Sequence, residues 1–330
     1  MNRYTIIIVG IILGLQACDE QDLSKAWIVN DPQVHQYFYT GGNFDTIGSG
    51  YNWSEGPVWI PSTQTLLFSD VPENKIYQWK EGKEPGVYLD PSGYTSSDPK
   101  AGETGSNGLA LDATSNLVLC QHGDRRVARM ETAVTRPESS FETLADNYQG
   151  KRFNSPNDLC IARDGKVFFT DPPYGLASPD SSEIGFQGVY RVDPNKNITL
   201  LIDSLTRPNG IALSIDEKTL YVANSDPDKA HWYAYQLDEN KNVISGGVLV
   251  DVTSMVPDLP GLPDGLKVHS SGIILATGPG GVHIISPDGN IMGRIHTGKP
   301  TSNCAIDDKE EYLYMTADDQ LLRIALKEII

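Results

Sequence analysis

Short runs in which apolar and polar residues alternate recur along most of the chain. In "LCIARDGKVFFTD" (residues 159–171), two such runs flank a turn that contains Asp and Gly. Alternation with a period of two is typical of β-strands, and two runs joined by a Gly- or Asp-containing turn indicate a β-hairpin. A third run, "GVYRVDP" (188–194), and a fourth, "ITLLIDS" (198–204), follow. The pattern therefore predicts a unit of four antiparallel strands.

This unit recurs six times. One polar position near the start of the first strand, hereafter the second position, recurs in every unit. It is occupied in turn by an acidic, amide or hydroxyl residue: Glu55, Asn107, Asn157, Asn209, Asp264 and, less clearly, Ser302. Successive positions are 52, 50, 52, 55 and 38 residues apart. A period near fifty residues with four strands in each repeat predicts an all-β fold, a six-bladed β-propeller of four-stranded antiparallel blades. A β-sandwich, the alternative for so many short strands, gives no reason for that period.

The last repeat ends after its third strand. A segment near the other end of the chain, "NFDTIGS" (43–49), resembles the fourth strand "FETLADN" of the second repeat. We therefore expect this N-terminal strand to complete the sixth blade. Such pairing would close the ring and leave no unpaired edge at the junction of the two chain ends.

The first residues have a different character. Arg3 precedes the apolar run "TIIIVGIILGL" (5–15), which ends in "LQAC" (15–18). A basic residue and a short apolar run are typical of a signal peptide, and "LQAC" resembles the lipobox of bacterial lipoproteins with Cys18 as the lipidated residue. We expect a signal peptide (1–18), a tether (19–40) and one propeller domain (41–330), lipid-anchored in a bacterial cell envelope, periplasmic or at the cell surface. An ordinary signal peptide is the alternative.

Composition limits the partners. The 330 residues carry a formal net charge of −17, which disfavours nucleic acid, since phosphate binding needs clustered Lys and Arg. Acidity of this kind favours solubility. Three cysteines remain after Cys18, and each of Cys120, Cys160 and Cys304 lies within an apolar run, so we expect small buried side chains. We expect the protein to be a monomer and its partner to be a small molecule.

The repeat also predicts where side chains meet. If the first strand of each blade lines the central channel, the six second-position residues surround the channel mouth on one face. Carboxylate and amide oxygens without thiol or imidazole are ligands that suit Ca²⁺ or Mg²⁺. Asn-Gly and Asp-Gly pairs are also common turn formers, which is a purely structural explanation for each position alone. Glu55 argues against that explanation for the set.

A second group of polar residues ends the second strands on the same face: Asp70, His122, Asp171 and Asn224. They are candidates to support the site, but turn formation for Asp171 and a hydrogen bond to a loop for His122 are alternatives. Asp171 begins "DPPYG", a stiff turn that could place Tyr174 over the pocket. The long connections 91–106 and 175–188 either cover the pocket or are tolerated insertions.

The motifs "SEGPVW", "SPND…TDPPYG", "RPNGIAL…LYVANS", "PDGLKV" and "PTSNCAI", in this order, resemble the senescence marker protein / gluconolactonase-like family over roughly residues 44–330. The resemblance implies a six-bladed propeller that binds one divalent cation, often calcium, and hydrolyses sugar lactones. It places the metal ligands on Glu55, Asn157, Asn209 and Asp264, and leaves Asn107 and Ser302 in the ring as substrate or supporting residues. In the animal sugar lactonases a substrate-contacting arginine lies two residues before the third-repeat Asn; here that residue is Ser155.

The resemblance also implies a mechanism. The cation, with Ca²⁺ expected and Mg²⁺, Zn²⁺ or Mn²⁺ as alternatives, would polarise the lactone carbonyl, and Asp264 would act as the general base for an attacking water. We therefore expect a hydrolase of carboxylic ester bonds, a gluconolactonase-like lactonase. A phosphotriesterase that uses the same metal site and a non-catalytic, calcium-stabilised binding propeller are the alternatives, because a fold alone does not establish catalysis.

Overall fold

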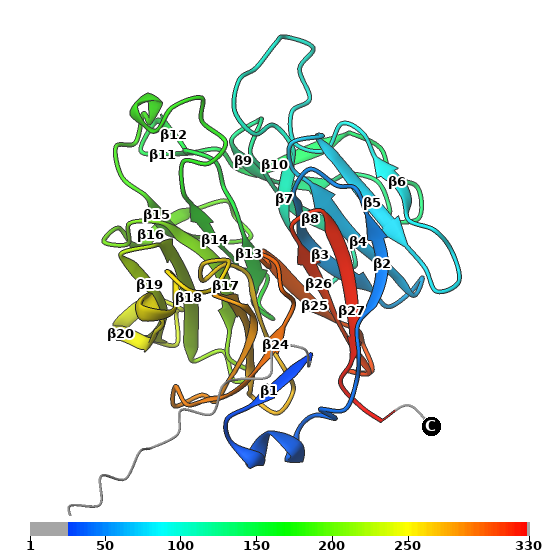
Figure 1. Ribbon diagram of the computed structural model, residues 1–330. Coiled ribbons are helices and arrows are strands. Elements are labelled where there is room, and N and C mark those ends of the chain that lie inside the picture. The colour runs from blue at the N-terminus through cyan, green and yellow to red at the C-terminus, as the bar shows by residue number, and fades with distance from the viewer. Residues whose placement is uncertain (1–25, 329–330) are drawn as a thin grey trace, which may run out of the picture.

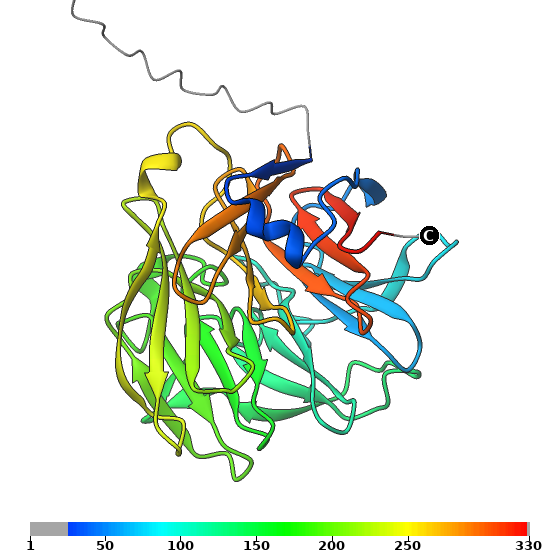
Figure 2. The same cartoon turned by 90° about the horizontal axis from the view of Figure 1, so that it is seen from below.

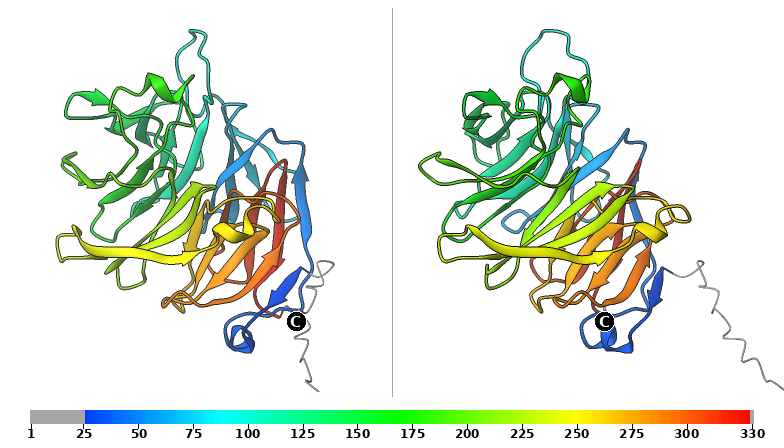
Figure 3. Two further views of the ribbon diagram at one scale, coloured as in Figure 1. Left: turned by 60° about the vertical axis from the view of Figure 1, so that its left-hand side comes forward. Right: turned by 90° about the vertical axis from the view of Figure 1, so that its left-hand side faces the viewer.

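The computed structural model describes residues 26–328 and consists almost entirely of antiparallel sheets. Six sheets follow one another in chain order around a ring, which confirms the predicted six-bladed β-propeller (Figures 1 and 3). The first blade contains β3 (Ser54–Ile60), β4 (Thr65–Asp70), β5 (Lys75–Trp79) and β6 (Gly86–Leu89). The second contains β7 (Ser106–Leu111), β8 (Leu117–Gln121), β9 (Arg126–Met130) and β10 (Phe141–Ala145).

The third and fourth blades have the same order of strands. The third contains β13 (Leu159–Ile161), β14 (Val167–Asp171), β15 (Gly188–Val192) and β16 (Ile198–Ile202). The fourth contains β17 (Pro208–Leu213), β18 (Thr219–Asp226), β19 (Lys229–Leu237) and β20 (Val243–Asp251). Outside the blades lie a small hairpin, β11 (Asn147–Tyr148) with β12 (Lys151–Arg152), and the 3₁₀ turns η2 (Pro179–Ser181) and η3 (Thr253–Met255).

The fifth and sixth blades bring the two ends of the chain together. The fifth contains β21 (Leu266–Val268), β22 (Ile274–Gly278), β23 (Gly281–Ile285) and β24 (Ile291–His296). The sixth contains β25 (Asn303–Ile306), β26 (Tyr312–Ala317) and β27 (Gln320–Ala325). Its fourth strand is β2 (Asp45–Ser49), which pairs antiparallel with β27 and lies beside it in Figure 1. The predicted closure of the ring by an N-terminal strand is therefore confirmed.

The segment predicted to be a tether is partly folded. β1 (Trp27–Val29) pairs with β24 as a fifth strand of the fifth blade, and η1 (Pro32–Gln36) follows it (Figure 2). Trp27, Val34 and Phe38 are buried in the apolar cluster between the fifth and sixth blades. The prediction of a tether over 19–40 was therefore wrong for residues 26–40, because their apolar side chains cover the junction at which the ring closes. Cys18 and the predicted signal peptide lie outside the described residues.

The apolar core is divided among the junctions between blades. Six clusters are found in residues 26–328, and each joins side chains from two adjacent blades. Alternate residues of each strand face one neighbouring blade or the other, so strands such as β4 and β8 are buried along their whole length. Cys120 and Cys304 are buried, as expected, whereas Cys160 is only partly buried, and all three are free thiols. No helix in the described range is long and apolar enough to cross a membrane.

Candidate active site

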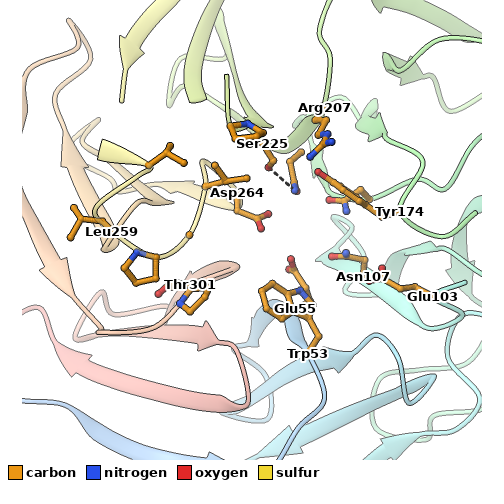
Figure 4. Close-up of a pocket in the computed structure, with 18 residues that line it drawn as sticks. Trp53, Glu55, Glu103, Asn107, Tyr174, Arg207, Ser225, Leu259, Asp264 and Thr301 are labelled. Atoms are coloured by element: carbon orange, nitrogen blue, oxygen red, sulfur yellow. Dashed lines mark hydrogen bonds between the residues drawn. The ribbon is translucent and has the colours of Figure 1, made fainter. Parts of the chain in front are cut away.

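A pocket of about 670 Å³ opens at the channel mouth on one face of the ring (Figure 4). The four predicted metal ligands, Glu55, Asn157, Asn209 and Asp264, all line it, and so does Asn107. Each lies on, or within two residues of, the first strand of its blade. The repeat therefore brings together side chains that are up to about two hundred residues apart in the sequence, as the strand order predicted.

The glycines that follow these residues have a packing role. Gly108 and Gly210 lie where the next blade approaches the channel, and a Cβ atom on them would be 2.8 Å from the Asn157 oxygen and 2.0 Å from the Asp264 oxygen of the main chain. Asn107 and Asn209 lie within strands β7 and β17. The turn-forming explanation of Asn-Gly is therefore wrong at these two positions: glycine lets the blades meet, and the preceding side chain faces the pocket.

Hydroxyl groups on the second strands fix the main chain of the site residues. Ser69 Oγ donates to the Asn107 carbonyl (2.9 Å), and Thr170 Oγ1 donates to the Asn209 carbonyl (2.7 Å). Thr277 Oγ1 donates to the Ser302 carbonyl (2.9 Å) in the same way. Each bond runs from one blade to the next, so the positions of the pocket side chains depend on the packing of the whole ring.

Several pocket oxygens have no hydrogen-bond partner among the described residues. They are Oδ1 of Asn107, Asn157 and Asp264, and all three atoms are buried. Asn209 donates from Nδ2 to Ser225 Oγ (3.0 Å), which leaves its Oδ1 as the remaining acceptor. Buried polar atoms normally have partners, since an unmade bond costs about 1–3 kcal/mol. Unsatisfied acceptors that gather in one pocket suit a bound cation or a hydrogen-bond donor of a ligand.

The pocket carboxyl groups ionise with difficulty. The pKa of Glu55 is raised to about 8, chiefly by burial and further by the charge of Asp158. The pKa of Asp264 is raised well above its ordinary value by burial and by the charges of Glu55, Asp158 and Glu103. Asn303 donates to two carboxyl groups, with Nδ2 3.4 Å from both Glu55 Oε2 and Asp158 Oδ2. A bound cation would favour the ionised form of these carboxyl groups.

The unsatisfied oxygens and the carboxyl groups with a raised pKa together fit a hard divalent cation. Two carboxylates and amide oxygens are suitable ligands for Ca²⁺, and waters complete its shell of about 6–8 oxygens. Within residues 26–328, no three His, Cys, Asp or Glu side chains form a metal-binding cluster on their own. The candidate ligand set is consistent with that result, since Asn157 and Asn209 supply half of it.

Three of the four residues at the second-strand ends bind the main chain. Asp171 accepts from the amides of Asn154 and Ser155 (both 2.8 Å), and Asn224 accepts from the amide of Arg207 (2.8 Å). Asp70 accepts from the amides of Asn52 and Trp53 in the same way. None of the three lines the pocket. Their geometry favours the structural alternative: they hold the segment that leads into the first strand.

His122 and Ser302 also lie outside the pocket lining. The fully buried His122 places Nδ1 3.1 Å from Glu103 Oε2, so it contacts a carboxylate and not the loop carbonyl that was the alternative. Ser302 Oγ donates to the Ser54 carbonyl (2.6 Å) across the closed ring. His122 can therefore act on the pocket only through Glu103, while Ser302 joins the sixth blade to the first.

The polar wall of the pocket contains Tyr174 and Arg207. The "DPPYG" turn places Tyr174 in the lining, as predicted, and burial and the Asp264 charge raise its pKa. Ser155 cannot replace the arginine of the animal lactonases, since it is buried and its Oγ donates to the Pro172 carbonyl (2.6 Å). Arg207 instead lies two residues before Asn209 and lines the pocket, without a salt bridge to any described residue.

Sequence reasoning missed other parts of the lining. Trp53 and the segment 256–262, with Val256, Leu259, Pro260 and Leu262, form apolar surface in the pocket. Connection 91–106 contributes Glu103, whereas connection 175–188 contributes no residue to the lining. The basic residue of "RPNG" was a usable signal, because it lies two residues before the site residue Asn209. The segment 256–262 carries no strand pattern or motif, so only the tertiary structure could place it.

The family model for the SMP-30/Gluconolactonase/LRE-like region matches residues 53–319. The chain belongs to this family. It is 39% identical to a gluconolactonase of Zymomonas mobilis over 292 residues, which cover 86% of this chain and 81% of that protein. It is 25% identical to the pentonolactonase XacC of Haloferax volcanii over 79% of this chain and 80% of that one. The suspected family resemblance is therefore confirmed.

Solved structures agree. A gluconolactonase of Xanthomonas campestris superposes with a TM-score of 0.79 at 30% identity, covering 91% of this chain and 94% of that one. A calcium-binding regucalcin of Agrobacterium tumefaciens superposes with a TM-score of 0.66 at 18% identity, covering 85% and 92%. The second match shows the fold alone, because its identity is low. The first match is to a gluconolactonase, and both matches share the propeller fold of this chain.

Proposed function

We propose that this protein is a divalent-cation-dependent lactonase that acts on sugar lactones of the gluconolactone type. Membership of the family makes it a hydrolase of lactone ester bonds. The observation that supports cation dependence is the set of unsatisfied oxygens and carboxyl groups with a raised pKa that face one pocket. Ca²⁺ is the proposed ion because every candidate ligand atom is an oxygen.

Glu55, Asn157, Asn209 and Asp264 would hold the cation. When bound, the cation supplies a Lewis acid that polarises the lactone carbonyl and stabilises negative charge on its oxygen. Asp264 acts as the general base that takes a proton from the attacking water, and a bound cation would keep its carboxyl group ionised and so able to accept that proton. Arg207, Tyr174 and Asn107 offer hydrogen-bonding groups that orient the hydroxyls of a sugar lactone.

The test is hydrolysis of glucono-δ-lactone, followed by acid release, with the chain before chelation, after chelation and after Ca²⁺ is restored. We expect activity that disappears on chelation and returns with Ca²⁺. Full activity in the chelated protein would contradict the metal requirement. No turnover by folded, Ca²⁺-loaded protein would contradict the lactonase proposal itself.

We also propose that Cys18 is lipidated and anchors the domain in the cell envelope. The support is the sequence alone: an apolar run that ends in "LQAC". Mass spectrometry of the protein made in a bacterium that processes lipoproteins would test it. We expect a diacylglyceryl group on Cys18 and its loss in Cys18→Ser, whereas unmodified protein cleaved at another position would indicate an ordinary signal peptide.

A further inference from the structure

The two walls of the pocket differ in chemistry. In Figure 4, Leu259 and Thr301 lie on one side of Asp264, and Tyr174, Asn107, Glu103 and Arg207 lie on the other. The segment that carries Leu259 also contributes Val256, Pro260 and Leu262, and Pro300 from the next connection adds to the same lining. One wall therefore offers hydrogen-bonding groups and charge, and the other is largely apolar.

The apolar wall has a fixed position. Pro257, Pro260 and Pro263 restrict the main chain of this segment, and the Gly280 amide donates to the Pro260 carbonyl (2.7 Å), which ties it to the fifth blade. Val256 and Leu262 pack against the apolar cluster between the fourth and fifth blades. Leu259 is not among the residues of that cluster and remains only half-buried in the pocket. Its side chain is therefore available to a ligand.

The pocket is also larger than a simple sugar lactone needs. Glucono-δ-lactone has about 12 non-hydrogen atoms, whereas cavities of about 300–1,000 Å³ hold drug-sized ligands. The volume here, about 670 Å³, lies in the middle of that range. A lactone ring placed against Asp264 with its polar groups on the Arg207 side would leave the Leu259 side unfilled.

We propose that the wall formed by Val256, Leu259, Pro260 and Leu262 is a second subsite, which binds an apolar substituent on the lactone. The lactonase should then act on sugar lactones and, in addition, on lactones that carry a hydrocarbon or aryl group on the ring. This inference rests on the proposed lactonase function. It adds a substrate class that the four proposed metal-binding residues do not by themselves determine.

The test compares δ-valerolactone with δ-decalactone, which carries a pentyl chain on the same ring. Each methylene that the wall covers should contribute about fourfold, so kcat/KM for δ-decalactone should exceed that for δ-valerolactone by at least about tenfold. Leu259→Asn, which keeps the approximate shape of the side chain, should lower this ratio at least about threefold. Ile244→Asn is the matched control, because Ile244 is 66% exposed on β20 and lies outside the pocket.

A ratio near one in the native chain, or an equal ratio in a folded Leu259→Asn variant, would overturn the subsite. Pro260→Ser provides a second variant if Leu259→Asn does not fold. Binding of 2-pentyltetrahydropyran, which has the ring and chain of δ-decalactone but no carbonyl, is measured by calorimetry in parallel. If the native chain hydrolyses no lactone but binds this compound, and Leu259→Asn weakens the binding, the proposed function is contradicted and the apolar subsite is retained. If the native chain neither binds the compound nor prefers δ-decalactone, the subsite is rejected.

Discussion

Two rings of polar residues lie at the same face of the propeller and differ in how their atoms are satisfied. The residues that begin the first strands, such as Asn157 and Asp264, leave buried oxygens without partners among the described residues. The residues that end the second strands, such as Asp171 and Asn224, accept main-chain amides of the segment before the first strand. Asp and Asn occur in both rings, so residue type alone does not separate function from scaffold. Unsatisfied hydrogen-bonding capacity separates Asp264 and Asn157 from Asp171 and Asn224.

The largest expected effect tests the unsatisfied ring. Asp264→Asn removes the candidate base and a ligand charge while it keeps the shape of the side chain. We expect kcat/KM for glucono-δ-lactone to fall by about 10²–10⁴-fold. Stability without Ca²⁺ should not fall, because a buried carboxyl group that is difficult to ionise has been removed. Steady-state kinetics together with a urea titration would check both parts, and near-native activity would remove Asp264 from the mechanism.

Substitutions in the ring that ends the second strands should lower stability and leave catalysis in place. Asp171→Ala leaves the buried amides of Asn154 and Ser155 without their acceptor, so we expect the free energy of unfolding to fall by about 2 to 5 kcal/mol. The fraction that remains folded should still hydrolyse lactone. Asp171→Asn, which keeps one acceptor oxygen, should be intermediate. Denaturant unfolding measures the loss, and a stable but inactive Asp171→Ala protein would show that the two rings are not separate.

Ca²⁺ should stabilise the protein through the ring that begins the first strands and not through the ring that ends the second strands. A ligand at 100 times its Kd stabilises the folded state by about 2.7 kcal/mol, so the urea midpoint of the native chain should rise with Ca²⁺. Glu55→Gln should lose this response, and without Ca²⁺ at pH 7 it should be at least as stable as the native chain, because the pKa of Glu55 near 8 makes its ionisation unfavourable. An undiminished Ca²⁺ response in Glu55→Gln would place the ion elsewhere.

The smallest expected effect concerns a satisfied group away from the pocket. His283 is buried with Nε2 2.9 Å from the Pro279 carbonyl, and burial lowers its pKa from 6.5 to about 4. Between these values the unfolded chain binds more protons, so stability rises with pH through this window and falls as pH decreases. We expect the His283 contribution to cost about 1 kcal/mol between pH 7 and pH 5.5. The difference between the native chain and His283→Gln, measured by urea unfolding at both pH values, isolates it; an equal pH response in both proteins would assign the effect to other groups.

Much of the fold was predictable because the propeller repeats a local pattern. Period-two runs, turn residues and the fifty-residue spacing each depend on neighbouring residues, and they correctly gave the blades and the closing strand β2. The predicted tether failed because Trp27, Val34 and Phe38 are three scattered apolar residues without a strand or helix period. Their burial depends on a junction between the fifth and sixth blades, which lies hundreds of residues away in the sequence.

For the site, the sequence by itself determined which residues begin the first strands, and strand order then placed Glu55, Asn107, Asn157, Asn209 and Asp264 together. It could not determine which oxygens remain unsatisfied, because Asp171 and Asp264 differ only in the amides that surround them. It also could not place Leu259 opposite Arg207, because an irregular segment has no period from which its direction follows. Local patterns are set by neighbours along the chain, whereas hydrogen-bond partners and pocket walls are set by contacts between blades, and only the tertiary structure decides those.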